Sequence, residues 1–577
     1  MNLLQSAMKK TLAFLPFLCL GLFLEAQNII KITDSDLQGD RTYNWTADNV
    51  YQLDGFIFLE EGGVLNIEAG TFIQGIESPS TSDNASALII ARGAKINALG
   101  TAEAPIVFTA EVDDLNDPID LTVNDRGFWG GLIILGYGQL ANATAETAVE
   151  GIPEGEGRAL FGGDNDQDNS GILRYVSIRH GGAELSPGNE INGLTLGAVG
   201  RETIIENIEV IANNDDGIEF FGGAVNVKYA AVSFCADDQF DWDLGWRGNG
   251  QFWMTLLGDD DGDNGGELDG AKPDDGEPTS NPTIYNATFI GAGCGARAKN
   301  ATGLLYRDGS AGTVAKSVIT GFNFGIEVED RASGMDSRQR MEAGDLVLSD
   351  NIWWDFCNGN ELNAGSNGFL RATEDAEDAT AQFLVDHLVT NNNIVQNPQF
   401  ILTRIDDGTF NPLGEDLTTT RDAHIDEYPE DDFFTPVCFT GAFGQDAVWI
   451  QNWTALATYG VLNPGLAFGL PTSSSSCATT SVEDIEIHAK GYSLIQNTPN
   501  PAWNSTQIGF TLATRRNVSL IIYDYTGKEI TRLMDNATYH AGLNTVELDV
   551  SNLANGIYFY TLSNEEVVLT KQLVVLK

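Results

Sequence analysis

Two pairs of aspartates, 22 residues apart, have the clearest capacity for chemistry in this sequence. Asp215-Asp216 and Asp237-Asp238 each lie between short apolar runs. Stacked strands are about 4.8 Å apart, so both pairs would meet at one corner if the chain coiled with that period. Carboxylates that close cannot all stay ionised unless a cation or a base lies between them. The pairs therefore predict either a calcium site or carboxyls with raised pKa values suited to acid–base work.

The acidic segment that follows adds further calcium ligands to this prediction. Its aspartates stand at alternate positions, but the glycine and glutamate of an EF-hand loop are not at the required places. The predicted metal ligands are Asp215, Asp216, Asp237, Asp238, Asp259, Asp261 and Asp263. An alternative stays open here, because Asp, Asn and Gly corners can also hydrogen-bond their own backbone without any metal.

Two tryptophans near the acidic segment are the predicted ligand-binding residues. Trp246 and Trp253 lie outside the strict repeat, so we expect them on the surface, where indole rings can stack on sugar rings. Trp242 falls on the repeat position of Phe220, and we expect it in the core.

A repeat of 22 residues is the element that must position these groups, because segment 207–220 falls on 229–242 with acids on acids and apolar residues on apolar residues. Gly303 and Gly325 mark two corners with the same spacing. Short strand-like runs separated by Asn, Asp and Gly corners, with no helical period between them, indicate a parallel β-solenoid.

The repeat fades toward the end of the expected β-helix domain, which spans residues 27–470. Residues 374–388 have a helical period, with Leu384 and Leu388 on one face. We expect residues 371–470 to form a cap over the last rung, because an exposed sheet edge would pair with other strands.

Both ends of the chain carry features of exported proteins. Two lysines precede an apolar run at 11–24, so residues 1–26 are predicted to be a signal peptide. No later run is long and apolar enough for a transmembrane helix. We expect a Ser-rich linker at 471–490, and the short strands of residues 491–577 suggest a small Ig-like β-sandwich.

The charge and the cysteines narrow the classes of partner and site. Net charge is −51, from 82 acidic and 31 basic residues. Repulsion on that scale argues against nucleic acid and anionic membranes as partners. It favours solubility, divalent cations or a saline setting, so the acidity can also be a solvated surface adapted to salt. The six cysteines, one of them inside the predicted signal peptide, are far apart. This spacing excludes a CxxC metal site and leaves one or two long-range disulfides open.

Most of the chain before residue 470 resembles the β-helix surface proteins of Bacteroidetes and some other Gram-negative bacteria. The resembling segments include LNIEAGTFIQG (65–75), NNDDGIEFFGG (213–223) and ADDQFDWDLGWRGNGQF (236–252). The resemblance implies a right-handed parallel β-helix. It implies no reaction, because such proteins generally lack a defined activity.

The C-terminal segment resembles the type A C-terminal sorting domain of the type IX secretion system. NTPNPAWNST (497–506), IIYDYTGKEI (521–530) and KQLVVLK (571–577) carry the resemblance. It implies that residues 491–577 engage the type IX secretion machinery. Export through the outer membrane, followed by surface attachment or release, would result.

These features favour a binding protein over an enzyme. We expect a secreted surface protein that binds extracellular polysaccharide or acts as an adhesin. The alternative is a β-helix polysaccharide hydrolase or lyase, because the acidic pairs are similar to polygalacturonase motifs. No histidine lies between His180 and His387, however, so the Gly-His-Gly of that family is missing. A lyase would also need a base beside the acids, for which Arg247, Arg297 and Lys299 are the nearby choices.

Overall fold

The computed structural model divides into two compact units, Met1–Cys477 and Ala478–Lys577. It describes residues 28–473 except 142–145, 154, 187–189, 333, 364–366, 374–380, 399–409, 414–427 and 445–447, and residues 493, 494, 497 and 502–577 except 513, 525–527, 541, 555, 565–567 and 576. The predicted signal peptide and most of the predicted linker lie outside the described residues. No helix among the described residues is long and apolar enough to cross a membrane.

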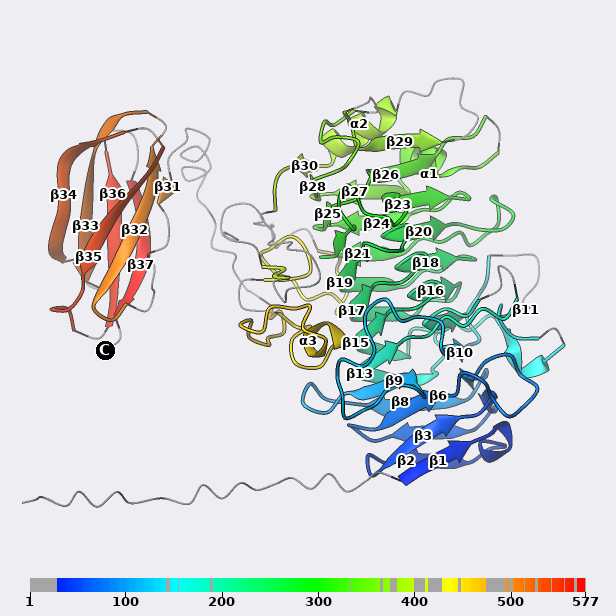
Figure 1. Cartoon of the computed structure of the whole chain (residues 1–577). Coiled ribbons are helices and arrows are strands. Elements are labelled where there is room, and N and C mark those ends of the chain that lie inside the picture. Colours follow the sequence, from blue (N-terminus) through cyan, green and yellow to red (C-terminus); the bar gives the residue numbers. More distant parts are fainter. Residues whose placement is uncertain are drawn as a thin grey trace, which may run out of the picture. The chain divides into compact units, whose positions relative to one another are not determined.

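The first unit is a stack of coils in which two parallel sheets face each other (Figure 1). The smaller sheet, called the short sheet here, has ten strands of four to six residues. They are β4 (Phe56–Leu59), β7 (Ala87–Ile90), β10 (Leu132–Leu135), β14 (Leu194–Gly197), β16 (Ile218–Phe221), β18 (Phe240–Asp243), β20 (Gly266–Asp269), β23 (Thr302–Arg307), β26 (Phe324–Glu329) and β29 (Leu370–Thr373).

The larger sheet, called the long sheet, has 18 strands and is bent along its length into a leading and a trailing half. The leading half contains β2 (Thr42–Trp45), β5 (Val64–Ile67), β8 (Lys95–Leu99), β21 (Thr283–Tyr285), β24 (Gly312–Ala315) and β27 (Leu346–Ser349). The trailing half contains β1 (Asn28–Ile32), β3 (Asn49–Leu53), β6 (Phe72–Gly75), β9 (Ile106–Ala110), β22 (Thr288–Ile290), β25 (Val318–Thr320), β28 (Ile352–Trp354) and β30 (Ile394–Val395). Both halves are spanned by β13 (Gly171–Arg179), β15 (Ile204–Ile211), β17 (Asn226–Ser233) and β19 (Asn249–Leu256).

A stack of left-handed residues makes the bend in the four long strands. Tyr175, Asn207, Tyr229 and Phe252 have φ angles between 49° and 60° and occupy equivalent positions in neighbouring strands. Non-glycine residues rarely adopt this conformation, so its recurrence at one position indicates that the coil geometry imposes it. The predicted parallel solenoid is confirmed, and β16 pairs with β18 at the predicted shift of 22 residues.

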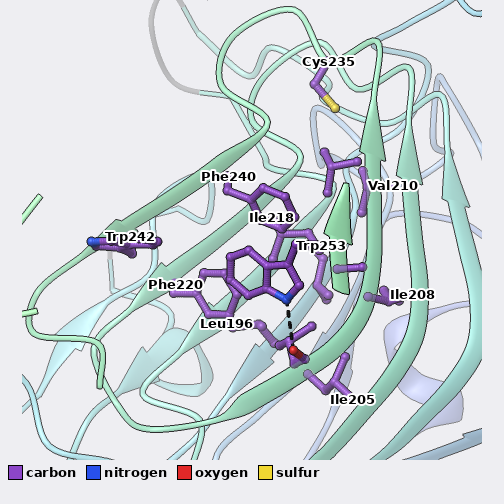
Figure 2. Close-up of a cluster of buried hydrophobic side chains, with 14 of the residues drawn as sticks. Leu196, Ile205, Ile208, Val210, Ile218, Phe220, Cys235, Phe240, Trp242 and Trp253 are labelled. Atoms are coloured by element: carbon purple, nitrogen blue, oxygen red, sulfur yellow. Dashed lines mark hydrogen bonds between the residues drawn. The ribbon is translucent and has the colours of Figure 1, made fainter. Parts of the chain in front are cut away.

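Apolar side chains from both sheets fill the interior of the coil (Figure 2). Ile218 and Phe220 point inward from β16, and Phe240 and Trp242 take the same places in β18. The residues between them therefore point outward, since side chains alternate along a strand. This alternation places Glu219 on the outer face of the short sheet.

A second apolar cluster lies on the outer face of the trailing half of the long sheet. Trp449 of a C-terminal segment packs there against Tyr229 of the sheet, and Trp453 of the same segment packs against Tyr175. The short helix α3 (Ala455–Thr458) belongs to this segment. The described part of residues 428–468 thus covers the side of the coil, so this part of the predicted cap, 371–470, does not lie over the last rung.

Two helices lie near the C-terminal end of the coil. Helix α1 (Ser337–Ala343) begins at Asp336, whose side chain accepts a hydrogen bond from Gln339 N at 2.7 Å. Helix α2 (Gln382–Thr390) buries Leu384 and Leu388 in the interior core, as its apolar period predicted. Residues 374–380, the first part of the predicted helix, lie outside the described residues.

Smaller elements and a disulfide complete the first unit. The 3₁₀ turns η1 (Asp34–Asp36) and η2 (Gly157–Ala159) and the two-stranded pair β11 (Thr147–Ala148) and β12 (Leu160–Phe161) lie in its connections. Cys294 and Cys357, 63 residues apart, form a disulfide. Cys438 is disulfide-bonded as well, whereas Cys235 is free and buried. A long-range disulfide, left open by the sequence, is therefore present.

The second unit is built from two antiparallel sheets around its own core, as the predicted β-sandwich requires. One sheet contains β31 (Ser493–Leu494), β32 (Ser505–Leu512) and β35 (Gly542–Asp549). The other contains β33 (Arg516–Asp524), β34 (Glu529–Tyr539), β36 (Gly556–Ser563) and β37 (Val568–Val575).

Candidate functional site

The two aspartate pairs stack in consecutive turns directly before β16 and β18. Asp238 N donates a hydrogen bond to Asp216 Oδ1 at 2.9 Å, and Asn264 N donates to Asp238 Oδ1 at 2.7 Å. Gly217 N also donates to the carbonyl oxygen of Asp238 at 3.0 Å. The carboxylates of Asp216 and Asp238 are therefore each held against the next turn by a backbone donor, and the predicted stacking of the two pairs is confirmed.

Seven carboxylates gather around these turns in three overlapping groups, within each of which the oxygens lie no more than 4.8 Å apart. The groups are Asp215–Asp216–Asp237, Asp237–Asp238–Asp263 and Asp216–Glu219–Asp241. Asp216 and Asp237 are shared, so the three groups form one continuous set. We call these seven residues the acidic cluster.

Five of the seven predicted metal ligands belong to the acidic cluster, namely Asp215, Asp216, Asp237, Asp238 and Asp263. The other two, Asp259 and Asp261, are in none of the three groups found among the described residues. The Nε atom of Arg297 lies 3.3 Å from Asp259 Oδ2 at an exposed position. Of the three metal ligands predicted in the acidic segment, only Asp263 therefore belongs to the acidic cluster.

Glu219 and Asp241 are members of the acidic cluster that the sequence reading did not select. They face each other in paired strands β16 and β18. The signal was available, because the two acids coincide in the 22-residue repeat and stand between inward-pointing apolar residues. Applying strand alternation to the repeat would have placed both beside Asp216.

The acidic cluster has little compensating positive charge. Lys299 Nζ lies 2.7 Å from Asp263 Oδ2 and 4.0 Å from Asp237 Oδ1. Among the described residues no basic side chain forms an ion pair with the other five carboxylates. Further along the same face of the short sheet, Arg307 pairs with Asp269 and Arg371 with Glu327, at 2.9 and 3.2 Å. Along the described part of this face, the carboxylates without a basic partner are therefore confined to the turns that contain β16 and β18.

Burial and mutual repulsion shift the protonation of the cluster. Burial, followed by repulsion from neighbouring carboxylates, raises the pKa of Asp215 and of Asp238 to about 7. The same causes raise the pKa values of Asp216, Glu219 and Asp241 well above their usual range. At neutral pH the cluster must hold protons or a cation, because ionised carboxylates at this spacing repel each other strongly.

Buried oxygen atoms at the cluster include two that accept no hydrogen bond from the described part of the chain. One is Asp241 Oδ1 and the other is Asn192 Oδ1. Asn192 is 1% exposed and donates its amide Nδ2 to Glu219 and, at 3.2 Å, to Glu150. A buried acceptor without a donor is costly, and coordination of a cation would satisfy it. Their chemistry fits an oxygen-ligated cation such as calcium.

The two predicted sugar-stacking tryptophans are in the interior, so the expectation that they are exposed is wrong. Trp246 and Trp253 are both fully buried. Trp253 stacks on Phe240 with ring centroids 4.3 Å apart and donates its Nε1 hydrogen to Val227 O at 2.9 Å (Figure 2). Trp246 stacks on Phe220 at 4.0 Å. Neither ring has a face free for a ligand.

Two family models match the chain. Residues 38–385 match a pectate-lyase-like β-helix domain, which spans more than half of the chain, and residues 498–576 match a secretion system C-terminal sorting domain. No curated protein and no solved structure matches the chain significantly. The sorting domain is that of the type IX secretion system and directs the protein to the cell surface or the extracellular space. The chain therefore belongs to the pectate-lyase-like β-helix proteins and carries a type IX secretion sorting domain at its C-terminal end.

Proposed function

We propose that this secreted β-helix protein binds extracellular polysaccharide, as an adhesin does, through calcium held by the acidic cluster. The observation that supports it best is the set of overlapping carboxylate groups with little positive charge beside them. Calcium takes six to eight oxygen ligands and tolerates irregular geometry, so a group of three carboxylates, completed by oxygens of water or of a ligand, suits it. Magnesium fits less well, because it demands a regular octahedron and keeps its waters.

Partial exposure of the cluster favours binding of a ligand over a purely structural ion. The side chain of Asp237 is 52% exposed and that of Asp263 19%, whereas Asp216 and Asp238 are buried. An ion bound between the exposed and the buried carboxylates would have protein ligands on its buried side and open coordination positions on its exposed side. Hydroxyl or carboxylate oxygens of a polysaccharide can fill such positions.

Calcium titration and glycan binding, measured on the same protein, test this proposal. We expect calorimetry to detect calcium binding to the wild type and a glycan array to show binding of acidic polysaccharides that EDTA abolishes. The double variant Asp216→Asn, Asp238→Asn should lose both signals, because it removes two negative charges while keeping side-chain size. Asp386→Asn, an exposed change on α2, is the matched control. Calcium binding that is equal in wild type and double variant would refute the proposal.

A calcium-assisted polysaccharide lyase is the second candidate. It is favoured by the position of Lys299, whose Nζ lies beside both Asp237 and Asp263. The hydrogen bond with Asp263 raises the pKa of Lys299, however, which keeps the amine protonated and opposes a role as general base. Formation of unsaturated uronate from an acidic polysaccharide, lost in Lys299→Gln, would establish the lyase. Binding without product supports the adhesin.

A further inference from the structure

A pocket that shares no lining residue with the acidic cluster opens beside the trailing half of the long sheet. Its volume is about 430 Å³. Several separate parts of the chain form its walls. They are the end of β19 with the segment after it, the turn after β22, the pair Val123 and Asn124, the single residues Gly321 and Asp355, and the C-terminal residues Phe410 and Val461. A volume of this size is in the range of ordinary small-ligand sites.

The pocket has an apolar floor and a polar rim. Leu256, Ile290, Phe410 and Val461 on the floor are each less than a tenth exposed. The rim carries carboxylates and a guanidinium group, from Asp259, Asp260, Asp355 and Arg297. A ligand that fills this pocket must therefore present one apolar face and several groups that both donate and accept hydrogen bonds.

Covalent and ionic links brace the walls. Cys294, which lines the pocket, is joined by its disulfide to Cys357. Arg126 holds Asp260 with two hydrogen bonds, of 2.7 and 3.2 Å, and its side chain is only 7% exposed. Walls held in this way need little ordering when a ligand binds, which favours affinity.

We propose that this pocket binds a single pyranose unit of a neutral polysaccharide, without calcium. The proposal deepens the proposed polysaccharide binding and rests on it. A pyranose ring offers its C–H face to the apolar floor, while its hydroxyls donate to Asp355 and Asp259 and accept from Arg297. Burial of the C–H face and hydrogen bonds to charged partners both favour such a complex.

The rim discriminates against the other ligand classes of this size. A fatty acyl chain would leave the rim carboxylates without hydrogen-bond donors. An alkylammonium ion offers hydrogen-bond donors alone, so it would leave the remaining guanidinium N–H groups of Arg297, whose Nε already faces Asp259, without an acceptor. A uronate would meet the carboxylates of Asp259 and Asp355, with Asp260 already engaged by Arg126. A neutral polyol uses donors and acceptors of the rim together.

Saturation-transfer NMR on the full-length protein in EDTA tests the pocket. The probes are the methyl α- and β-pyranosides of glucose, galactose and mannose. We expect at least one of them to bind the wild type. Ala292→Phe, which fills the cavity from its lining, should abolish that binding. Asp355→Asn should weaken it about tenfold, the loss of one charged hydrogen bond. Asp386→Asn on α2 is the control for the same chemical change away from the pocket, and melting temperatures show whether the variants fold.

The results separate this proposal from the calcium proposal. If no glycoside binds the wild type, or if Ala292→Phe binds as the wild type does, the pocket assignment is overturned. Binding that requires calcium and disappears in the Asp216→Asn, Asp238→Asn variant also overturns it, while the calcium proposal stands. Binding that persists in EDTA and in that double variant, but is lost in Ala292→Phe, supports the pocket whatever the outcome of the calcium titration.

Discussion

At the scale of single residues, Asp238 shows how burial and like charge make the acidic cluster sensitive to pH. It is 3% exposed, and its pKa is raised to about 7, whereas an unfolded aspartate titrates near pH 3.9. Between these values the folded chain binds a proton that the unfolded chain does not. The contribution of Asp238 to the free energy of unfolding is therefore full below about pH 4 and is lost as the pH rises to about 7.

Replacing Asp238 with asparagine should flatten this pH dependence. In EDTA, we expect the melting temperature of wild type to fall between pH 5 and 8 by more than that of Asp238→Asn, because the amide does not ionise. Calcium should raise the melting temperature of wild type at pH 8 and raise that of the variant less, since binding to the folded state stabilises it. Thermal unfolding followed by circular dichroism measures both effects. Identical pH profiles for the two proteins would contradict the raised pKa.

Trp246 shows that the 22-residue repeat does not predict the direction of every side chain. The residue follows β18 in a connection and has no counterpart in the 22-residue alignment, so the repeat assigns it no side. In the structure its ring turns inward and its Nε1 donates to Val225 O at 3.2 Å. An indole that can pack against Phe220 and satisfy its N–H gains more from burial than from exposure.

At the scale of elements, Glu209 of β15 holds the C-terminal segment against the trailing half of the long sheet. It is fully buried, and its carboxylate accepts hydrogen bonds from Ala455 N at 2.7 Å and Leu456 N at 3.3 Å, at the start of α3. Ser177 Oγ in β13 donates to the same carboxylate. One side chain thus satisfies backbone donors that would otherwise be buried without a partner.

We expect Glu209→Ala to loosen this segment more than it unfolds the coil. Two buried backbone donors and a hydroxyl lose their acceptor, which should cost at least about 2 kcal/mol locally. Hydrogen exchange should therefore speed up in residues 449–459 while β16 and β18 stay protected. Glu206→Ala, in the same strand but half-exposed and paired with Arg174, is the control and should leave exchange unchanged. If hydrogen exchange in Glu209→Ala sped up equally in residues 449–459 and in β16 and β18, Glu209 would not act as a local clamp.

At the scale of the whole molecule, the chain joins a β-helix unit to an export signal. The β-helix unit presents the acidic cluster and the pocket, whereas residues 498–576 match the sorting domain that type IX secretion requires. The two units have separate cores, so either can be altered without removing the packing of the other.

Removing the second unit should therefore stop export without unfolding the first. We expect a chain that ends before Tyr492 to accumulate in the periplasm, because it lacks the segment that the secretion machinery recognises. Fractionation with an antibody against the β-helix unit measures its location, and retained calcium binding would show that the truncated protein is folded. Normal surface display of the truncated chain would show that the sorting domain is not needed.

The sequence by itself determined the solenoid, the sorting domain and the stacking of Asp216 and Asp238 in consecutive turns. These follow from local rules: a fixed period, strand alternation and a contiguous set of terminal motifs. It also held the information for Glu219 and Asp241, which lie on the same period. Only the tertiary structure decided the partners of residues outside the repeat, such as the ion pair of Asp259 with Arg297.

The sequence likewise did not determine where the segments outside the repeated coil lie. Residues 428–468 carry no period, so their position on the side of the coil depended on the apolar outer face that Tyr229 and Phe252 offer. The pocket likewise arises from parts of the chain more than a hundred residues apart, as between Ile290 and Val461. Such contacts are set by the free energy of burying surfaces against each other, which no single stretch of sequence encodes.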